Sequence, residues 1–407
     1  MRSDALRAVP FGAGLYAALT LLGCESSLPT REVPAGNCIQ ESDCAANGQV
    51  CKANQCVACS NNGDCASQFC DVYGDTGPAG RCTAPAQSAF VDSGDANQEF
   101  CGISDGTAQH PYCSIAAAFD KLSPGTPTAP VYIRLLTSPN AYCLPALTSA
   151  RGALVFVGPG SFKAGLAATI IADTDDGNIQ IGDGARVVFD GFVMSSPSIT
   201  AGNAANVTLR RVNVRDLSVG AVFKSATVSM DRVLFSSNYA GITLQASTAN
   251  ITNAVWTANF IPTGQNLIDV IGGSGGLQFA TIFKNMAAAT ASNVLACQSA
   301  SAFSIRNSIV AMNGVSQQLG TACSVAAGSV VVGSSDPASG QIKQDPAFVD
   351  PAVGDLRLKA FDPVNTQYVI DRAVNVSSSD KNVDHDFYGT ARPQGAGYDI
   401  GAVEFVP

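Results

Sequence analysis

Charged side chains recur at fixed places in a repeated sequence pattern that begins near residue 186. Three positions after the first apolar residue of successive copies stand Asp190, Arg210 and Asp231, and one position further stand Gly191, Arg211 and Arg232. If the copies stack as neighbouring strands about 4.8 Å apart, opposite charges alternate along one face. Guanidinium groups bind carboxylates well. The candidate contacts for a uronate of an acidic glycan are therefore Arg211, Arg215 and Arg232.

The same charges also fit a plain ladder of ion pairs on a solvated sheet, where each pair contributes little free energy. We favour this interpretation and predict no catalytic residue. The two carboxylates of a glycosidase, about 5 to 9 Å apart, could be supplied by many surface pairs. Only two histidines, His110 and His385, are present. The chain therefore offers few histidines from which a Ser-His-Asp triad or a histidine-based metal site could be built.

Two acidic clusters suggest calcium as the one candidate cofactor. Residues 173–178 read Asp-Thr-Asp-Asp-Gly-Asn, and residues 384–386 read Asp-His-Asp. Carboxylate oxygens suit Ca²⁺, although the register of an EF-hand loop is missing. Such residues more often cap turns through their own backbone. The candidate ligands are Asp173, Asp175, Asp384 and Asp386.

The elements that must position these side chains follow from the repeat. Its pattern is apolar, any, apolar, any two, apolar, any, apolar. The copies begin at Val187, Val207, Val228, Ala249, Leu277 and Phe303. A period of 20 to 28 residues indicates a solenoid. The copies are too short for strand–helix–strand units and lack helical periodicity. Two short strands that meet at a bend would stack into an all-β parallel β-helix.

A β-sandwich with regular hairpins is the alternative, but Asn-Gly and Asp-Gly turns are scarce between the copies. Asn238, Asn259 and Asn313 follow the last apolar position of their copies, so their amides could form a ladder at a turn. Residues 113–122 predict a helix with Ser114 as N-cap. That helix would cover the open end of the solenoid, which otherwise exposes its core.

Several motifs after residue 90 resemble bacterial surface proteins with a right-handed, pectate-lyase-like parallel β-helix, including the choice-of-anchor Q domain proteins. The matching stretches are residues 91–94 (VDSG), 113–115 (CSI), 305–310 (IRNSIV), 345–351 (DPAFVDP), 354–358 (GDLRL), 370–371 (ID), 392–393 (RP) and 399–404 (DIGAVE). The resemblance implies the fold over residues 88–407. It does not imply an activity, because this scaffold hosts lyases, hydrolases, adhesins and spacers.

The N-terminus predicts export. Arg2 and Arg7 precede an apolar run that ends at Gly23, which is typical of a signal peptide in residues 1–23. Leu21-Leu22-Gly23-Cys24 resembles a bacterial lipobox, so we expect lipidation of Cys24 and attachment to a membrane. A plain signal peptide followed by an ordinary cysteine is the alternative. Residues 24–37 form a polar linker, and we expect the protein in the outer membrane, at the cell surface.

Eight cysteines crowd into residues 38–84 as two units of four. They are Cys38, Cys44, Cys51, Cys56, Cys59, Cys65, Cys70 and Cys82. In an exported chain such a cluster predicts a disulfide framework, with pairing inside each unit as the simplest arrangement. A zinc ribbon using Cys56-x-x-Cys59 is the alternative. Further expected disulfides are Cys101–Cys113 and Cys297–Cys323, which leaves Cys143 over. We expect the cysteine-rich module to act as a stalk.

The formal net charge of −9 argues against nucleic acid as a partner. We expect a non-enzymatic surface protein that binds or adheres to glycans or extracellular matrix through its β-helix. The first alternative is a polysaccharide lyase or glycoside hydrolase acting on acidic polysaccharide. The second is a structural surface spacer.

Overall fold

The computed structural model describes residues 38, 43–44, 47–73, 79–94, 103–160, 168–172, 177–289, 293–298, 301–315, 317–320, 322–326, 330–332, 342–351, 354–377, 380 and 382–407. Four residues with predicted roles lie outside this part of the chain: Cys24, Cys101, Asp173 and Asp175.

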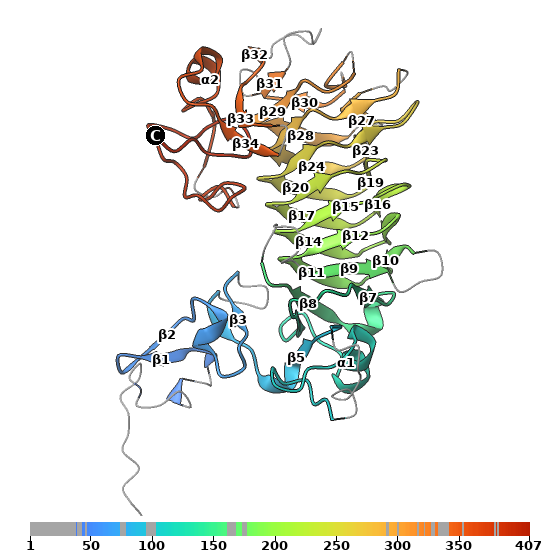
Figure 1. Ribbon diagram of the computed structural model, residues 1–407, viewed down its shortest axis with the longest axis vertical. Helices are drawn as coiled ribbons and strands as arrows, with labels where there is room; N and C mark the ends of the chain where they lie inside the picture. The colour runs from blue at the N-terminus through green and yellow to red at the C-terminus, as the bar shows by residue number, and fades with distance from the viewer. Residues whose placement is uncertain are drawn as a thin grey trace, which may run out of the picture.

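The chain folds into an all-β parallel β-helix of about eight turns, as the repeat predicted (Figure 1). Within the described residues, face 1 has ten strands: β5 (Ser88–Val91), β6 (Val131–Leu135), β8 (Ala153–Val157), β11 (Arg186–Asp190), β14 (Asn206–Arg210), β17 (Thr227–Asp231), β20 (Thr248–Thr252), β24 (Ser274–Gln278), β28 (Ala302–Arg306) and β30 (Ser324–Val325).

Face 2 also has ten: β7 (Tyr142–Leu144), β9 (Thr169–Ala172), β12 (Val193–Ser195), β15 (Asn213–Arg215), β18 (Leu234–Ser236), β21 (Val255–Thr257), β25 (Thr281–Phe283), β29 (Ser308–Ala311), β31 (Val330–Val332) and β32 (Ile342–Lys343). Face 3 has six: β10 (Ile179–Ile181), β13 (Ser198–Ala201), β16 (Gly220–Lys224), β19 (Ile242–Gln245), β23 (Ile268–Ile271) and β27 (Leu295–Gln298).

The expectation of two strands in each coil was therefore incomplete, because a third strand closes the coil on face 3. The turns before this strand vary in length: two residues separate β12 from β13, whereas four separate β15 from β16. This variation removes a fixed spacing from the sequence and hides the third strand. Alternate residues of all three faces point inward. Their side chains form one continuous core, in which Phe156 stacks on Phe189 and Phe235 on Trp256.

A ladder of buried asparagines fixes the turn after face 2. The Nδ2 of Asn238 donates to Oδ1 of Asn259 at 2.9 Å, Asn259 donates to Asn285 at 2.8 Å, and Asn285 donates to Asn313 at 2.7 Å. Each amide also donates to a carbonyl of a neighbouring strand. The predicted ladder is confirmed, and Asn285 extends it through a copy of the repeat that is weak in sequence.

The predicted cap helix is also confirmed. Helix α1 (Ile115–Lys121) begins after Ser114, whose side chain accepts a hydrogen bond from the Ala117 amide at 3.1 Å. Ile115, Ala118 and Phe119 are buried in the same core as the strands. The helix therefore closes the first coil.

The cysteine-rich module contains two small hairpins, β1 (Val50–Lys52) with β2 (Gln55–Val57) and β3 (Cys70–Asp71) with β4 (Arg81–Cys82). Two 3₁₀ turns, η3 (Asn62–Asp64) and η4 (Pro85–Gln87), complete it. The disulfides are Cys38–Cys51, Cys44–Cys56, Cys59–Cys70 and Cys65–Cys82. Pairing stays inside each four-cysteine unit, as expected. Because all eight thiols are consumed, the zinc-ribbon alternative is wrong.

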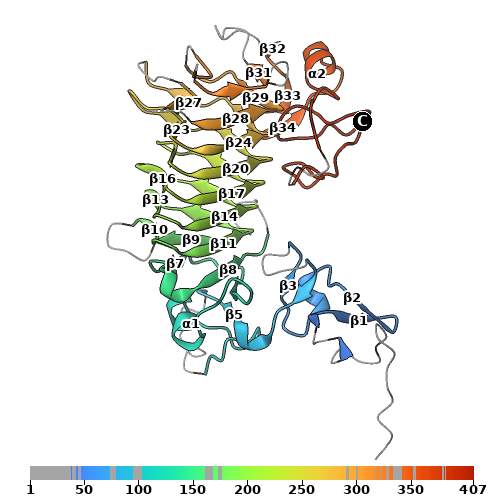
Figure 2. The same ribbon diagram turned by 180° about the vertical axis from the view of Figure 1, so that it is seen from behind.

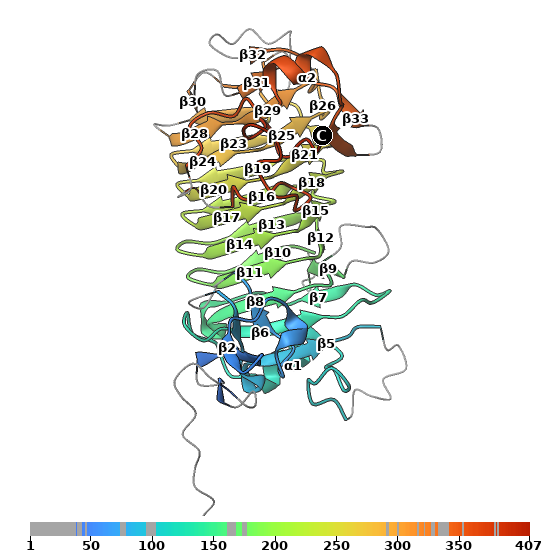
Figure 3. The same cartoon turned by 90° about the vertical axis from the view of Figure 1, so that its left-hand side faces the viewer.

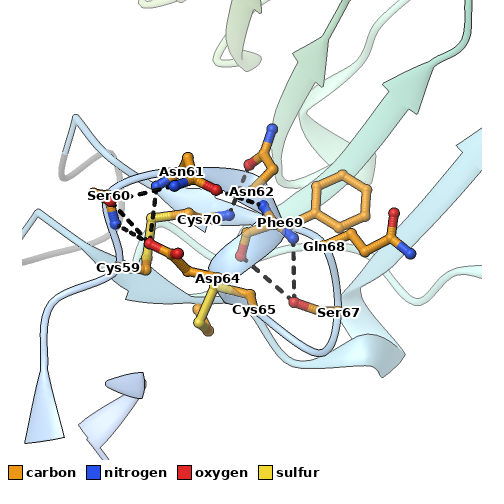
Figure 4. Close-up of a disulfide and its surroundings, with 12 residues drawn as sticks. Cys59, Ser60, Asn61, Asn62, Asp64, Cys65, Ser67, Gln68, Phe69 and Cys70 are labelled. Atoms are coloured by element: carbon orange, nitrogen blue, oxygen red, sulfur yellow. Dashed lines mark hydrogen bonds between the residues drawn. A yellow bond between two sulfur atoms is a disulfide. The ribbon is translucent and has the colours of Figure 1, made fainter. Parts of the chain in front are cut away.

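The module does not stand away from the β-helix as a stalk would. Its second unit packs on face 1, where the Phe69 ring lies 5.2 Å from that of Phe90 and 6.0 Å from that of Tyr132. Phe69 projects from the loop that the Cys59–Cys70 disulfide closes, while Asp64 accepts hydrogen bonds from Ser60 in the same loop (Figure 4). An almost fully buried phenylalanine explains the docking, because exposing it would be unfavourable.

The C-terminal segment folds back on the other end of the solenoid. It contains β33 (Phe348–Asp350), β34 (Asp355–Leu358) and α2 (Pro363–Tyr368). Its apolar residues cover the outer side of face 2, where Phe283 contacts Phe348 with ring centroids 4.6 Å apart. The module and this segment lie on the same side of the β-helix, at different heights along its axis (Figures 2 and 3).

Among the described residues, no helix combines the length and apolar character needed to span a membrane. The disulfide Cys297–Cys323 joins neighbouring coils as expected, with Cα atoms 4.9 Å apart. Cys113 is also disulfide-bonded, and its expected partner Cys101 lies outside the described residues. Cys143 is exposed in β7.

Candidate functional site

The predicted charge columns exist and meet at one corner of the solenoid. In register, Asp190 pairs with Arg210 and Arg210 with Asp231 along face 1. The next residues, Arg211 and Arg232, occupy the turn to face 2 with φ values of 50° and 54°. Non-glycine residues rarely adopt this left-handed conformation. We call Asp190, Arg210, Arg211, Asp231 and Arg232, with Tyr73 and His385 beside them, the charged corner.

Each arginine of the corner already has a partner within the protein. Arg211 holds Asp190, with Nε and a terminal nitrogen both 2.7 Å from Oδ1. Burial alone would lower the pKa of Arg211, but the Asp190 charge outweighs burial and raises it. Arg232 donates to Asp231 at 3.1 Å and, from a terminal nitrogen, to the Tyr73 hydroxyl at 3.1 Å. The corner is thus a compact network of opposite charges.

Tyr73 brings the cysteine-rich module onto this corner. The guanidinium carbon of Arg210 lies 4.0 Å from the centroid of the Tyr73 ring, which is a close cation–π contact. A cavity of about 380 Å³ separates the module from face 1 here, and its lining includes Asn61, Tyr73, Asp190 and Arg211. Nothing in the repeat pattern signals Tyr73, because it precedes the first recognised copy of the repeat, at Val187, by more than 100 residues.

His385 brings the C-terminal segment to the same corner. Its Nε2 lies 3.0 Å from Oδ2 of the buried Asp231, and its Nδ1 lies 2.9 Å from Oδ1 of Asp384. Asn253 donates to Asp231 as well, at 3.0 Å. Burial opposes ionisation of Asp231, but the hydrogen bond and charge of His385 and the charge of Arg232 outweigh it and lower the pKa. Asp231 therefore anchors the segment.

The sequence candidates do not all come together. Arg211 and Arg232 meet at the charged corner, but Arg215 ends β15 on face 2 and faces Asp216, with Nε 3.4 Å from Oδ2. The structure does not bring these three arginines together. The bend between β14 and β15 turns Arg215 onto another face.

The two described calcium candidates have separate partners. Asp384 is exposed and faces His385. Asp386 is buried, and its carboxylate accepts hydrogen bonds from the amides of Thr390 and Glu404, at 2.7 and 3.0 Å. This is the turn-capping role that aspartate often takes. Among the described residues, the only groups of three or more potential metal ligands are cysteines engaged in disulfides. Calcium binding stays a prediction.

A second feature of face 1 escaped sequence analysis. In β24, Gly275 points inward and Gly276 outward; Gly275 has no room for a side chain, and one on Gly276 would need Ser304 to shift. A Cβ on Gly275 would lie 1.9 Å from the Ala249 carbonyl oxygen, and one on Gly276 would lie 2.8 Å from Ser304 Oγ. The missing side chain of the outward Gly276 leaves a depression of about 380 Å³ above the strand. We call it the polar hollow.

The hollow is lined mainly by uncharged hydrogen-bonding groups. Its polar lining consists of Asn250, Thr252, Gln278, Ser304, Arg306 and Asp380. The one cation among its described residues, Arg306, is held by Asp380 at 3.0 Å and donates to Gln278 at 2.9 Å. Burial opposes ionisation of Asp380, yet hydrogen bonds from the Ser377 amide and Arg306 lower its pKa. The hollow therefore presents amides and hydroxyls around a neutralised ion pair.

Comparisons with known proteins add little to this geometry. No protein-family model and no curated protein sequence matches the chain. Among solved structures, it is similar to the crystal structure of the pectate lyase Pel9A, with 13% sequence identity and a TM-score of 0.33. That similarity covers 78% of this chain and 96% of the other. We draw no conclusion about function from it.

Proposed function

We propose that this protein is a lipid-anchored cell-surface protein whose β-helix binds glycans without cleaving them. The polar hollow carries the proposal. Amide and hydroxyl groups both donate and accept hydrogen bonds, which suits the many hydroxyls of a sugar chain. Placing them in a depression on a rigid sheet fixes their geometry before binding and lowers the entropic cost of association.

The charged corner supports binding over catalysis. A catalytic base must be able to reach a substrate proton. Arg211 and Arg232 instead donate to Asp190 and Asp231, and only 29% and 13% of their side-chain surfaces are exposed. A lyase that used either arginine would first have to break a short ion pair. The corner therefore serves to hold the module and the C-terminal segment against the β-helix.

A panel of neutral and acidic polysaccharides, with and without calcium, tests the proposal. Retardation in gels containing each polysaccharide measures binding, and release of unsaturated or reducing ends measures turnover. We expect binding without turnover, weakened at least tenfold by Ser304→Trp, which would fill the hollow. Turnover abolished by Arg211→Ala or Arg232→Ala would contradict the proposal and establish an enzyme. Absence of both binding and turnover would contradict the proposal and favour a structural spacer.

The matched control is Ser229→Trp. Ser229 stands in the same outward column of face 1 as Ser304, on β17, and does not line the hollow. Binding lost equally in both variants would show that any bulky residue on face 1 interferes.

The lipid anchor needs its own experiment. Metabolic labelling with a palmitate analogue should mark the wild-type protein, and the label should be lost from Cys24→Ser. Equal labelling of the two proteins would contradict the anchor and the surface location inferred from it.

A further inference from the structure

Tyr239 ends a stack of side chains in the turns that follow face 2, away from the charged corner. It follows the ladder residue Asn238, and Phe260 and Met286 follow the next two ladder residues. The rings of Tyr239 and Phe260 are stacked, with centroids 4.9 Å apart and planes inclined by 12°. Phe260 pairs in register with Met286 between β22 (Phe260–Ile261) and β26 (Met286–Ala287). The stack therefore follows the solenoid axis.

The stack stops at Tyr239 because the next rung carries a small residue. The turns 216–219 and 237–240 have equal length, so Ser218 takes the place that Tyr239 has one coil later. The Tyr239 amide bonds to the Leu217 carbonyl at 2.7 Å, which fixes this register. The coil before that has only Ser196 and Pro197 in its turn.

One face of the Tyr239 ring is consequently open. Phe260, between Tyr239 and Met286, is partly buried, whereas Tyr239 is 57% exposed. An exposed tyrosine face is a rigid apolar platform with a polar tip, and it is ordered at little entropic cost.

The rung that faces this ring exposes two polar side chains, Asp216 and Ser218, beside the exposed Val219. Asp216 lies two residues before Ser218 and is held by Ser195 and by Arg215, whose Nε is 3.4 Å away. About 56% of the Asp216 side chain stays exposed. A carboxylate beside an open ring face can accept hydrogen bonds from neighbouring hydroxyls of a ring-shaped ligand. The Ser218 hydroxyl, also exposed, can donate or accept.

We propose that Tyr239, Ser218 and Asp216 form a second glycan-binding site, which takes a neutral pyranose ring. The bound sugar ring continues the stack. Its C–H face lies on the Tyr239 ring, above Ser218, and its hydroxyls donate hydrogen bonds to Asp216. An acidic sugar is disfavoured because the exposed carboxylate and the net charge of −9 repel it. This inference rests on the proposed glycan-binding function but uses none of the residues of the polar hollow.

The test is calorimetric titration of the full chain with cellohexaose, xylohexaose and maltohexaose, supported by saturation-transfer NMR. Tyr239→Ala removes the platform and should weaken binding of the recognised hexasaccharide roughly tenfold or more. Tyr239→Phe keeps the ring and should bind within about threefold of wild type. Ser218→Phe is the sharpest variant, because it keeps Tyr239 and covers the open face of its ring; it should weaken binding as much as Tyr239→Ala.

Tyr388→Ala, which removes a tyrosine that is 49% exposed in the C-terminal segment, is the matched control and should bind as wild type. Wild-type affinity in Tyr239→Ala or in Ser218→Phe would overturn the inference. If no hexasaccharide binds but a polysaccharide is still retarded in a Ser304→Trp-sensitive way, the second site is refuted and the proposed function stands. If neither ligand binds, both fail.

Discussion

Replacing Asn259 with alanine tests how the coils are held in register. The Asn259 side chain is fully buried and takes part in four hydrogen bonds. Its Nδ2 donates to the Phe235 carbonyl and to Asn285 Oδ1, at 3.0 and 2.8 Å, and its Oδ1 accepts from the amide and the Nδ2 of Asn238, at 3.1 and 2.9 Å. Asn259→Ala therefore leaves the Asn238 amide and one Nδ2 hydrogen without an acceptor.

Each buried polar group that loses its partner costs about 1–3 kcal/mol. Water admitted to the space left by the side chain offsets part of this. We expect Asn259→Ala to lower the free energy of unfolding by about 3–5 kcal/mol. The assay is urea unfolding followed by fluorescence of Trp256, the single tryptophan, which is buried in β21 of the same coil.

Asn250→Ala is the matched control, because Asn250 lies exposed on β20 of that coil. Its change in the free energy of unfolding should stay within about 0.5 kcal/mol. Equal free energies of unfolding for Asn259→Ala and Asn250→Ala would refute the reasoning.

Three further predictions concern the parts that pack on the solenoid. Tyr73→Ala removes the ring over Arg210 and the hydroxyl that accepts from Arg232, and should weaken docking of the module by about 1–2 kcal/mol. Tyr73→Phe keeps the ring and should weaken docking by less than about 1 kcal/mol. Faster hydrogen exchange in β11 and β14 of the alanine variant alone would confirm this, and equal exchange in both variants would contradict it. Burial and the nearby Glu404 raise the pKa of Asp399 to about 7, so the folded state keeps a proton that an unfolded aspartate releases near 3.8. Stability should therefore fall as pH rises from about 4 to 7. The melting temperature of Asp399→Asn should vary less with pH in that window, and an unchanged pH dependence would exclude Asp399 as its source. Replacing both Cys65 and Cys82 with serine opens a loop of 17 residues and should destabilise the module by about 3 kcal/mol. Proteolysis of the module should become faster, while the unfolding transition followed by Trp256 fluorescence stays unchanged. A shift of that transition would show that the β-helix depends on the module.

The sequence predicts the solenoid well where the same residue type returns at a fixed spacing. Val187, Val207 and Val228 lie in register on face 1, and Asn238 and Asn259 bond across one rung. Stacked coils impose this repetition, since each side chain must pack on its counterpart in the next coil. Asn285 was missed because Gly275 stands where the other copies have their first apolar residue, so this copy was read from Leu277, two residues too late.

The contacts that build the charged corner could not be predicted from the repeat. Tyr73 comes from the segment that precedes the solenoid in sequence, and His385 from the segment that follows it. They meet near Asp231 only because both segments pack on the same side of the solenoid in space. The polar hollow was hidden for another reason. Gly275 stands in place of the first apolar residue and makes this copy of the repeat faint, whereas the hollow depends on the outward Gly276, at a position where the pattern allows any residue.

The proposed function depends on whether a glycan occupies the polar hollow. The most direct measurement is the dissociation constant of the best-retarded polysaccharide for wild type, Ser304→Trp and Ser229→Trp, with release of sugar ends followed in the same samples. We predict that Ser304→Trp alone weakens binding at least tenfold and that no sugar ends are released. Equal affinity in all three proteins, or turnover by the wild type, would contradict a binding site without catalysis on face 1.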